Sequence, residues 1–431
     1  MRTNAFRWAI STTVILLILA SGACAPATTP AAPTEAAVPP SPVPTSPPTE
    51  TPIPTATPIP TATNTPFFPK AIVKIVSQSP ATVDIGKGAQ LAVEQLSGPL
   101  RDLGYEVQYV AYDDQDNVDV AVKNARQIID DAAVLCGVGH YTSRVTINTM
   151  DLYHLAGLAF VSPSATKPEV TDKHYPEINR VTGRNDVLGA AMARFVVDQG
   201  YASVFIARDD SDFSNQARGL FRSEASQAGV KIVDDLAVSV AIGNDEVVAA
   251  RVLAANPDAV FYIGFAPDAG PFFRQVRLAG YQGVLLSLDA DLGLASAAGP
   301  LALEGKGLYY VDTVGLVEST AAQSKFAADF RGEFGKQPGP FAVEAYDAAG
   351  VCLRAIEEAS KAKGGELPTR PEVAKAIRSL KDYVGITGTF GFDQHGDPTA
   401  VRYFVKQAVT SDPEKWGENP VVATFELPPP K

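Results

Sequence analysis

Six segments of the chain combine Ser, Thr and Asp with a few aromatic residues, and each follows a short apolar run. They are residues 77–84, 139–144, 162–167, 209–215, 264–268 and 288–291. In open parallel sheets, ligands bind beyond the carboxyl ends of the strands, so we expect the binding site among these segments. The chain has neither G-x-G-x-x-G after a strand nor G-x-x-x-x-G-K-[ST], so no phosphate-binding loop is expected.

Thr142 and Ser143 stand directly before a helical pattern over residues 145–155. The first turn of a helix offers unpaired amide groups and partial positive charge, which favour an anion such as a carboxylate. The segment at residues 162–167 adds further hydroxyls at what we expect to be an adjacent strand end. The alternative is that these hydroxyls only cap helices. Two such loops at adjacent strand ends favour binding.

The composition excludes several other kinds of site. The chain has 431 residues, 46% hydrophobic and 19% charged, enough for two or three domains. A net charge of −12 argues against nucleic acid or anionic lipid as a main partner. The four histidines and three cysteines show no metal-ligand spacing, so we expect no metal and no cofactor. Cys136 and Cys352 fall in an apolar run and a helical pattern, and we expect two small buried residues that do not pair.

Residues 1–23 have the pattern of an export signal, with a basic start, an apolar run and small residues before Cys24. A cysteine at that place is similar to the bacterial lipoprotein signal, in which it is diacylated and becomes the mature N-terminus. Ser21 stands where that signal usually has Leu, and ordinary cleavage near Ala25 is the alternative. Residues 24–69 are mainly Pro, Thr, Ala and Ser. Such a composition predicts a tether of about 100 Å without helix or sheet.

Folded sequence begins near Lys70 and alternates short apolar runs with helical patterns. The runs that we expect to form strands are residues 71–76, 107–112, 134–138, 159–162, 203–207, 259–263, 284–288 and 307–311. This alternation predicts parallel sheets with right-handed crossovers, covered by helices on both faces. Roughly 360 residues exceed one such sheet, so we expect an α/β fold of two Rossmann-like lobes.

Several motifs occur in an order that points to one family. They are Tyr112-Asp-Asp, Val138-Gly-His-Tyr-Thr-Ser143, Ser162-Pro-Ser-Ala-Thr166, Arg180-Val-Thr-Gly183, Asp209-Asp-Ser-Asp-Phe213 and Phe390-Gly-Phe-Asp-Gln-His-Gly-Asp397. The chain thereby resembles the branched-chain amino-acid-binding family, the type I periplasmic solute-binding proteins of ABC importers. The resemblance implies three crossover strands, near Thr182, Asp312 and Gly388. The parts implied are lobe 1 at residues 70–182 and 312–388, lobe 2 at residues 183–311 and 389–420, and a tail at residues 421–431.

The family binds an amino acid between its lobes, and the resemblance implies the ligand contacts here. The carboxylate is assigned to one group of residues by match: Thr142, Ser143, Ser164, Ala165 and Thr166. Asp289 takes the place of the ammonium-binding glutamate, and Asp291 is a rival for that role. A charge-assisted bond of this kind is worth about 1.5–3 kcal/mol. Phe213 and Phe265 stand where the family often has tyrosines, and core packing is the alternative for each ring.

The resemblance implies an extracytoplasmic lipoprotein, anchored through Cys24, that captures an amino acid, branched-chain or a similar small polar solute, by lobe closure. Its partners would be the permease and ATPase of an ABC importer, and we expect a monomer. One alternative is a sensor that presents its ligand to a signalling or cell-wall partner. An enzyme using Ser143 with His140 is the other alternative, and it lacks G-x-S-x-G and a third catalytic residue.

Overall fold

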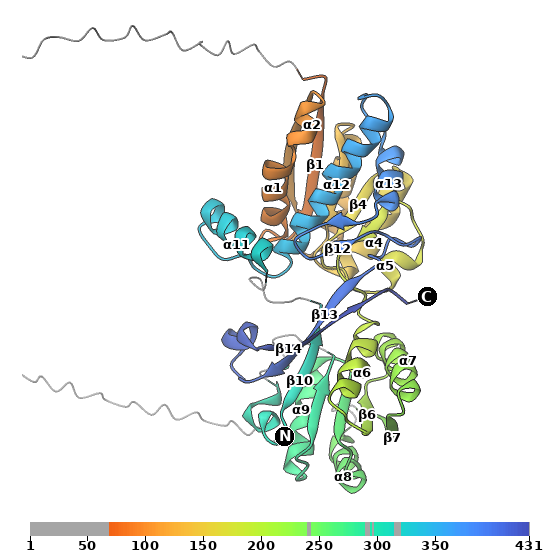
Figure 1. Cartoon of the computed structure of the whole chain (residues 1–431), viewed down its shortest axis with the longest axis vertical. Helices are drawn as coiled ribbons and strands as arrows, with labels where there is room; N and C mark the ends of the chain where they lie inside the picture. The colour runs from red at the N-terminus through yellow and green to blue at the C-terminus, as the bar shows by residue number, and fades with distance from the viewer. Residues whose placement is uncertain (1–68, 239–242, 289–293, 295–296, 314–319, 431) are drawn as a thin grey trace, which may run out of the picture. The chain divides into compact units, whose positions relative to one another are not determined.

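The structure is a computed structural model that describes residues 69–238, 243–288, 294, 297–313 and 320–430. Within these residues the chain forms two α/β lobes, each built on its own sheet with helices packed against it (Figure 1). The predicted α/β fold with mainly parallel sheets is confirmed. None of the helices in the described part of the chain is both long enough and apolar enough to span a bilayer.

Lobe 1 contains a parallel sheet with the strand order β2-β1-β3-β4-β5. Its strands are β1 (Ala71–Ser79), β2 (Tyr105–Asp113), β3 (Val134–Gly139), β4 (Ala159–Ser162) and β5 (Ile178–Arg180), and a short separate pair is formed by β11 (Tyr383–Val384) and β12 (Thr389–Phe390). Its helices are α1 (Ile85–Leu96), α2 (Gly98–Asp102), α3 (Val118–Asp130), α4 (Ser143–Leu155), α5 (Glu169–Asp172), α11 (Ala321–Phe334), α12 (Ala342–Ala362) and α13 (Arg370–Ser379).

Lobe 2 contains a sheet with the strand order β14-β13-β10-β9-β8-β6-β7. Its strands are β6 (Ser203–Arg208), β7 (Lys231–Ala237), β8 (Ala259–Ile263), β9 (Val284–Ser287), β10 (Leu308–Asp312), β13 (Val401–Ala408) and β14 (Val421–Leu427). Its helical segments are α6 (Leu188–Asp198), α7 (Asp212–Gln227), α8 (Asp245–Ala255), α9 (Ala266–Leu278), η1 (Pro300–Leu303) and η2 (Pro413–Glu418). Strands β13 and β14 are antiparallel to their neighbours. The segment expected to be a C-terminal tail therefore contains an edge strand of this sheet.

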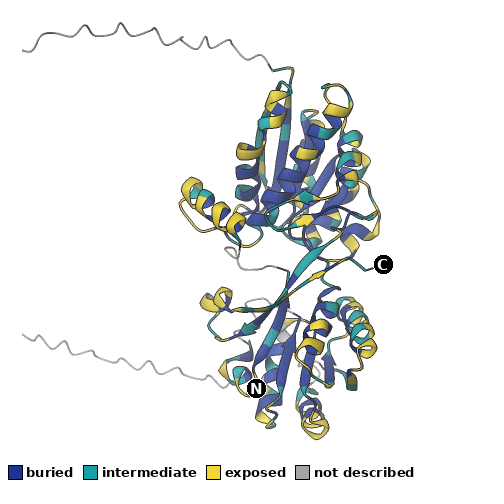
Figure 2. Ribbon diagram, viewed as in Figure 1, coloured by how far each residue is buried: buried dark blue, intermediate teal, exposed yellow. Residues whose placement is uncertain are grey.

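Apolar side chains on successive strand residues belong to clusters on opposite faces of each sheet. In Figure 2 the central strands of both sheets are accordingly coloured mainly as buried. In β1, Ile75 packs into one cluster of lobe 1 and Val76 into the other. Strand β6 does the same in lobe 2, with Phe205 and Ile206 in different clusters. This two-sided burial explains why the strands appear in the sequence as nearly unbroken apolar runs.

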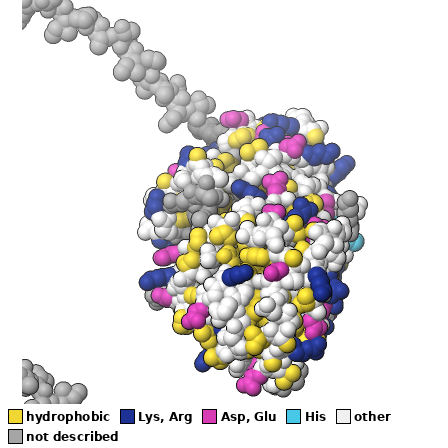
Figure 3. Space-filling view, turned by 60° about the horizontal axis from the view of Figure 1, so that its bottom comes forward, with side chains coloured by type: hydrophobic (Ala, Val, Ile, Leu, Met, Phe, Trp, Pro, Cys, Tyr) yellow, Lys and Arg dark blue, Asp and Glu magenta, His cyan; other side chains and the backbone are white. Residues whose placement is uncertain are grey.

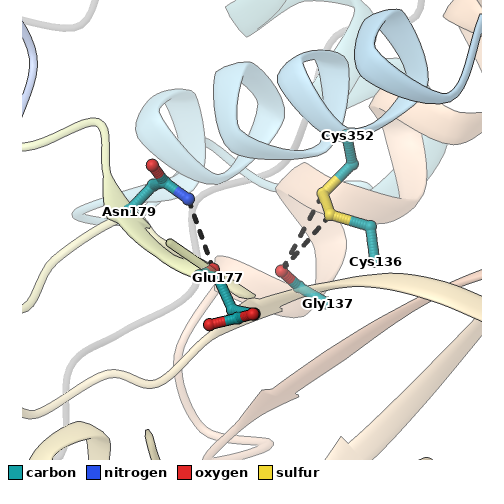
Figure 4. The surroundings of a disulfide bond; sticks show 5 residues. All are labelled: Cys136, Gly137, Glu177, Asn179 and Cys352. Carbon is teal, nitrogen blue, oxygen red and sulfur yellow. Dashed lines mark hydrogen bonds between the residues drawn. A yellow bond between two sulfur atoms is a disulfide. The ribbon is translucent and has the colours of Figure 1, made fainter. Parts of the chain in front are cut away.

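Cys136 in β3 and Cys352 in α12 form a disulfide inside lobe 1 (Figure 4). Both side chains are fully buried, as expected from the sequence. The expectation that they do not pair is wrong. The two residues are 216 positions apart, and they meet only because α12 packs against β3.

The crossovers between the lobes can be located from the core that each residue joins. Val181 packs in lobe 1 and Val187 in lobe 2, so the first crossover lies between these two residues, a range that includes the expected Thr182. The third differs from the expectation at Gly388. Phe392 still packs in the core of lobe 1, and the chain joins the core of lobe 2 by Val401.

Candidate functional site

The two hydroxyl-rich loops of lobe 1 lie side by side because they follow the paired strands β3 and β4. The backbone amide of Lys167 donates a hydrogen bond to Ser143 Oγ (3.2 Å). Ser164 Oγ donates to the carbonyl oxygens of His140 (3.0 Å) and Tyr141 (2.7 Å). The residues predicted to bind a carboxylate are thus brought together at one edge of the sheet.

The start of α4 is not capped by the hydroxyls that precede it. Thr142 is the N-cap residue by backbone conformation, but its side chain makes no capping bond. Its hydroxyl donates instead to Asp116 Oδ1 (2.5 Å), in the loop after β2. The capping alternative therefore does not account for Thr142. The first turn of α4 keeps amide donors that no described side chain caps.

The other predicted residues of this loop differ in what they can still offer a ligand. Ala165 is fully buried, its amide donates to Ser162 Oγ (3.0 Å), and its carbonyl accepts from Arg180 (2.9 Å). The hydroxyl of Ser164 is occupied as described above. Ser143 and Thr166 are half-buried, and each places a hydroxyl at this edge of lobe 1. They are the predicted residues whose side chains can best reach a carboxylate.

His140 is held in a buried polar cluster beneath these loops. Its Nδ1 lies 2.7 Å from Asp114 Oδ2, and its Nε2 lies 2.9 Å from Thr149 Oγ1. Burial lowers the pKa of His140, and the neighbouring carboxylate of Asp114 only partly opposes this. Both ring nitrogens face these partners, so His140 cannot serve as a base for Ser143. The hydrolase alternative therefore has no support in the geometry.

In lobe 2, Phe213 and Phe265 lie together at the carboxyl ends of the paired strands β6 and β8. Their ring centroids are 5.4 Å apart, and the ring planes are inclined by 39°. Phe265 is 47% exposed, so core packing does not explain it. Phe213 is half-buried and rests against the core of lobe 2. Asp289 and Asp291, the predicted ammonium ligands, lie outside the described residues.

Charged side chains of both signs lie at the loop edges. In lobe 1, Arg144 and Lys167 are exposed beside the hydroxyl loops, and Arg144 lies 3.6 Å from Asp116 Oδ1. In lobe 2, Asp212 and Asp268 lie in the first turns of α7 and α9, which begin beside the two rings. On the face of the protein drawn in Figure 3, basic and acidic side chains are also interspersed.

A small cavity of about 60 Å³ lies among the crossovers, and no motif in the sequence indicates it. Thr182, Thr313 and Thr387 contribute to its lining, together with Glu344 and Arg402. Burial raises the pKa of Glu344 to about 7. Nearby on α12, the buried Asp347 accepts bonds from the amides of Ile386 and Thr387 (both 2.8 Å). Within the described ranges, no group of three or more His, Cys, Asp and Glu side chains is placed to hold a metal ion.

Comparison with known proteins gives concordant results. A family model described as periplasmic binding protein matches residues 77–412. The Leu/Ile/Val-binding protein homolog 1 of Brucella melitensis is 25% identical over 323 residues, which cover 74% of this chain and 84% of that protein. The leucine-, isoleucine-, valine-, threonine- and alanine-binding protein of Pseudomonas aeruginosa is 25% identical, covering 75% and 87%.

Solved structures show the same fold. A leucine-binding protein from Thermotoga maritima superposes with a TM-score of 0.62 at 25% identity, covering 82% of this chain and 98% of that protein. An ABC transporter substrate-binding protein from Desulfitobacterium hafniense, in complex with Leu, gives a TM-score of 0.64 at 22% identity and covers 78% and 97%.

Proposed function

The chain belongs to the periplasmic binding protein family, and we propose that it captures an amino acid for an ABC importer by closing its two lobes. The ligand would be a branched-chain amino acid or a similar small polar solute. The relatives that cover three quarters of this chain are named as amino-acid-binding proteins, which supports this assignment.

The observation that carries the proposal is the uncapped start of α4 beside Ser143 and Thr166. Amide donors, hydroxyls and the positive end of a helix together provide for a carboxylate. The pair of rings formed by Phe213 and Phe265 would contact the body of the ligand, and Asp289 would receive the ammonium group. Phenylalanines make that wall drier than the tyrosines of the family would, which favours a ligand with an apolar side chain.

The proposed location is outside the cytoplasm, at the membrane. The disulfide between Cys136 and Cys352 supports this, since such bonds persist in oxidising compartments and are rare in the cytosol. Lipidation of Cys24 would anchor the chain, and residues 24–69 would act as the tether. The protein would work as a monomer that a membrane permease and its ATPase recognise in the closed form.

The experiment that tests this function starts with mass spectrometry of any small molecule that copurifies with the protein. A thermal-shift screen of the twenty amino acids follows, with amides, urea and small aromatic acids as the wider set. A ligand at a hundred times its Kd stabilises the folded state by about 2.7 kcal/mol, which is a readily measured rise in melting temperature. If none of these compounds changes the melting temperature, the proposal is refuted.

A further inference from the structure

Phe213 and Phe265 come from different loops, and something must fix the distance between them. Phe213 is the second residue of α7, and Phe265 is the N-cap residue of α9. The ring centroids are 5.4 Å apart, which is ordinary for one aromatic pair, but Phe265 is about half exposed and so has few other neighbours. Ring packing alone therefore gives little restraint on Phe265.

Asp209, directly after β6, bonds to both loops with a single carboxylate. Its Oδ1 accepts from the amide of Ser211 (2.9 Å), from the hydroxyl of Ser211 (2.6 Å) and from the hydroxyl of Ser214. Its Oδ2 accepts from the amide of Phe265 (3.2 Å). One oxygen thus holds the start of α7, and the other holds the start of α9.

Two further features fit this role. Ser211, and not Asp209, caps α7, since the hydroxyl of Ser211 accepts from the amide of Ser214 (3.2 Å). Asp209 therefore accepts a hydrogen bond from the capping residue Ser211 and is not itself the cap of α7. At Gly264, a Cβ atom would lie 2.5 Å from Asp209 Oδ2, so the carboxylate can approach this loop only because the residue is glycine.

We propose that Asp209 is a positioning residue that sets the separation and orientation of the Phe213 and Phe265 rings. It does not touch the ligand. Its effect on binding rests on the proposed function, because the rings matter to a ligand only if they line the site. The bridge itself is a property of lobe 2 and can be tested without a ligand.

Asp209→Asn is the sharpest substitution. If the amide oxygen of the asparagine keeps the serine bonds, its NH₂ group faces the amide of Phe265, and two donors then oppose each other. Asp258→Asn is the matched control. Asp258 Oδ2 accepts from Ala202 N (2.9 Å), Ser203 N (3.0 Å) and Ser203 Oγ (3.0 Å), so it makes a similar bridge before the same two strands, β6 and β8. Gly264→Ala gives a second perturbation if Asp209→Asn fails to fold. Its Cβ atom would lie 2.5 Å from Asp209 Oδ2 and 2.8 Å from the ring of Tyr262, so it displaces the carboxylate and also presses on that ring.

Hydrogen exchange followed by mass spectrometry on the unliganded protein decides the proposal. We expect Asp209→Asn to speed exchange at the amide of Phe265 at least tenfold, and Gly264→Ala to do the same. Asp258→Asn should leave exchange at Ala202, Ser203 and Phe265 unchanged, because all three bonds to Asp258 go to one oxygen and the amide oxygen of an asparagine can accept them. Exchange at Phe265 that stays at the wild-type rate in both Asp209→Asn and Gly264→Ala overturns the assignment.

Titration with L-leucine then measures the consequence for binding. Asp209→Asn should weaken L-leucine at least tenfold in the wild-type background and less than twofold in the Phe265→Ala background, because the residue acts through that ring. Equal losses in both backgrounds overturn the positioning role. A wild-type protein that binds no amino acid counts against the proposed function, whereas the exchange data still decide on Asp209.

Discussion

Breaking the disulfide between Cys136 and Cys352 should lower the free energy of unfolding by about 5 kcal/mol. The two residues are 216 positions apart, and the loop-entropy relation gives about 5 kcal/mol at 25 °C for a loop of that length. This loop contains all of lobe 2 except β13, η2 and β14. If lobe 2 stayed folded while lobe 1 unfolded, the effective loop would be about half as long. The stabilisation would then fall by only about 0.6 kcal/mol, because it depends on the logarithm of loop length.

Urea unfolding of a soluble form that starts at Ala25 measures this loss. The oxidised and the reduced wild type are compared with the Cys136→Ala/Cys352→Ala double variant. Both cysteines are fully buried, so alanine also leaves small voids, which cost about 1 kcal/mol each. The reduced wild type separates the cross-link from this packing loss. Oxidised and reduced wild type that unfold at the same urea concentration would contradict the expected stabilisation. Two free thiols in the unreduced, denatured protein would show that the disulfide is not formed.

Three further outcomes can be checked. Burial raises the pKa of Asp347 to about 6, above its value in an unfolded chain, so its contribution to stability is present at pH 4 and lost as the pH rises through 6. From pH 4 to pH 7, the difference in unfolding free energy between Asp347→Asn and wild type should therefore move by about 2 kcal/mol in favour of the variant. Urea unfolding that gives parallel pH profiles for the two proteins contradicts this. Ser143→Ala and Thr166→Val should each weaken the binding of an amino acid about tenfold, because each removes one charge-assisted hydrogen bond. The control Ser379→Ala, at the exposed end of α13, should leave the affinity unchanged. If calorimetry gives the same affinity for all three variants, the proposed carboxylate site is wrong. Cys24→Ala should move the protein from the membrane fraction to the soluble fraction, and a mature N-terminus without lipid in mass spectrometry of the wild type rules out the anchor.

Local pattern was enough to predict much of the fold and part of the site. Each of the eight apolar runs expected as strands lies within a strand, except for one residue beyond the end of β9 and one before the start of β10, because strands buried on both faces are nearly continuous in apolar residues. Ser143 and Ser164 were expected at one sheet edge, and the structure places their loops in contact. Phe213 and Phe265 were likewise expected after the carboxyl ends of strands, and their rings lie in contact there. Weakly patterned segments such as β5 and β14 were missed.

The sequence by itself determined the class of fold and the kinds of side chain at the strand ends. Burial requires apolar residues at regular positions within each strand and helix, and this pattern can be recognised from neighbouring residues in the sequence. Only the tertiary structure decided which distant residues meet. The pairing of Cys136 with Cys352, the retention of Phe392 in lobe 1 and the bridge from Asp209 to Phe265 each depend on how elements pack. Such contacts join residues through space, and no spacing along the chain encodes them.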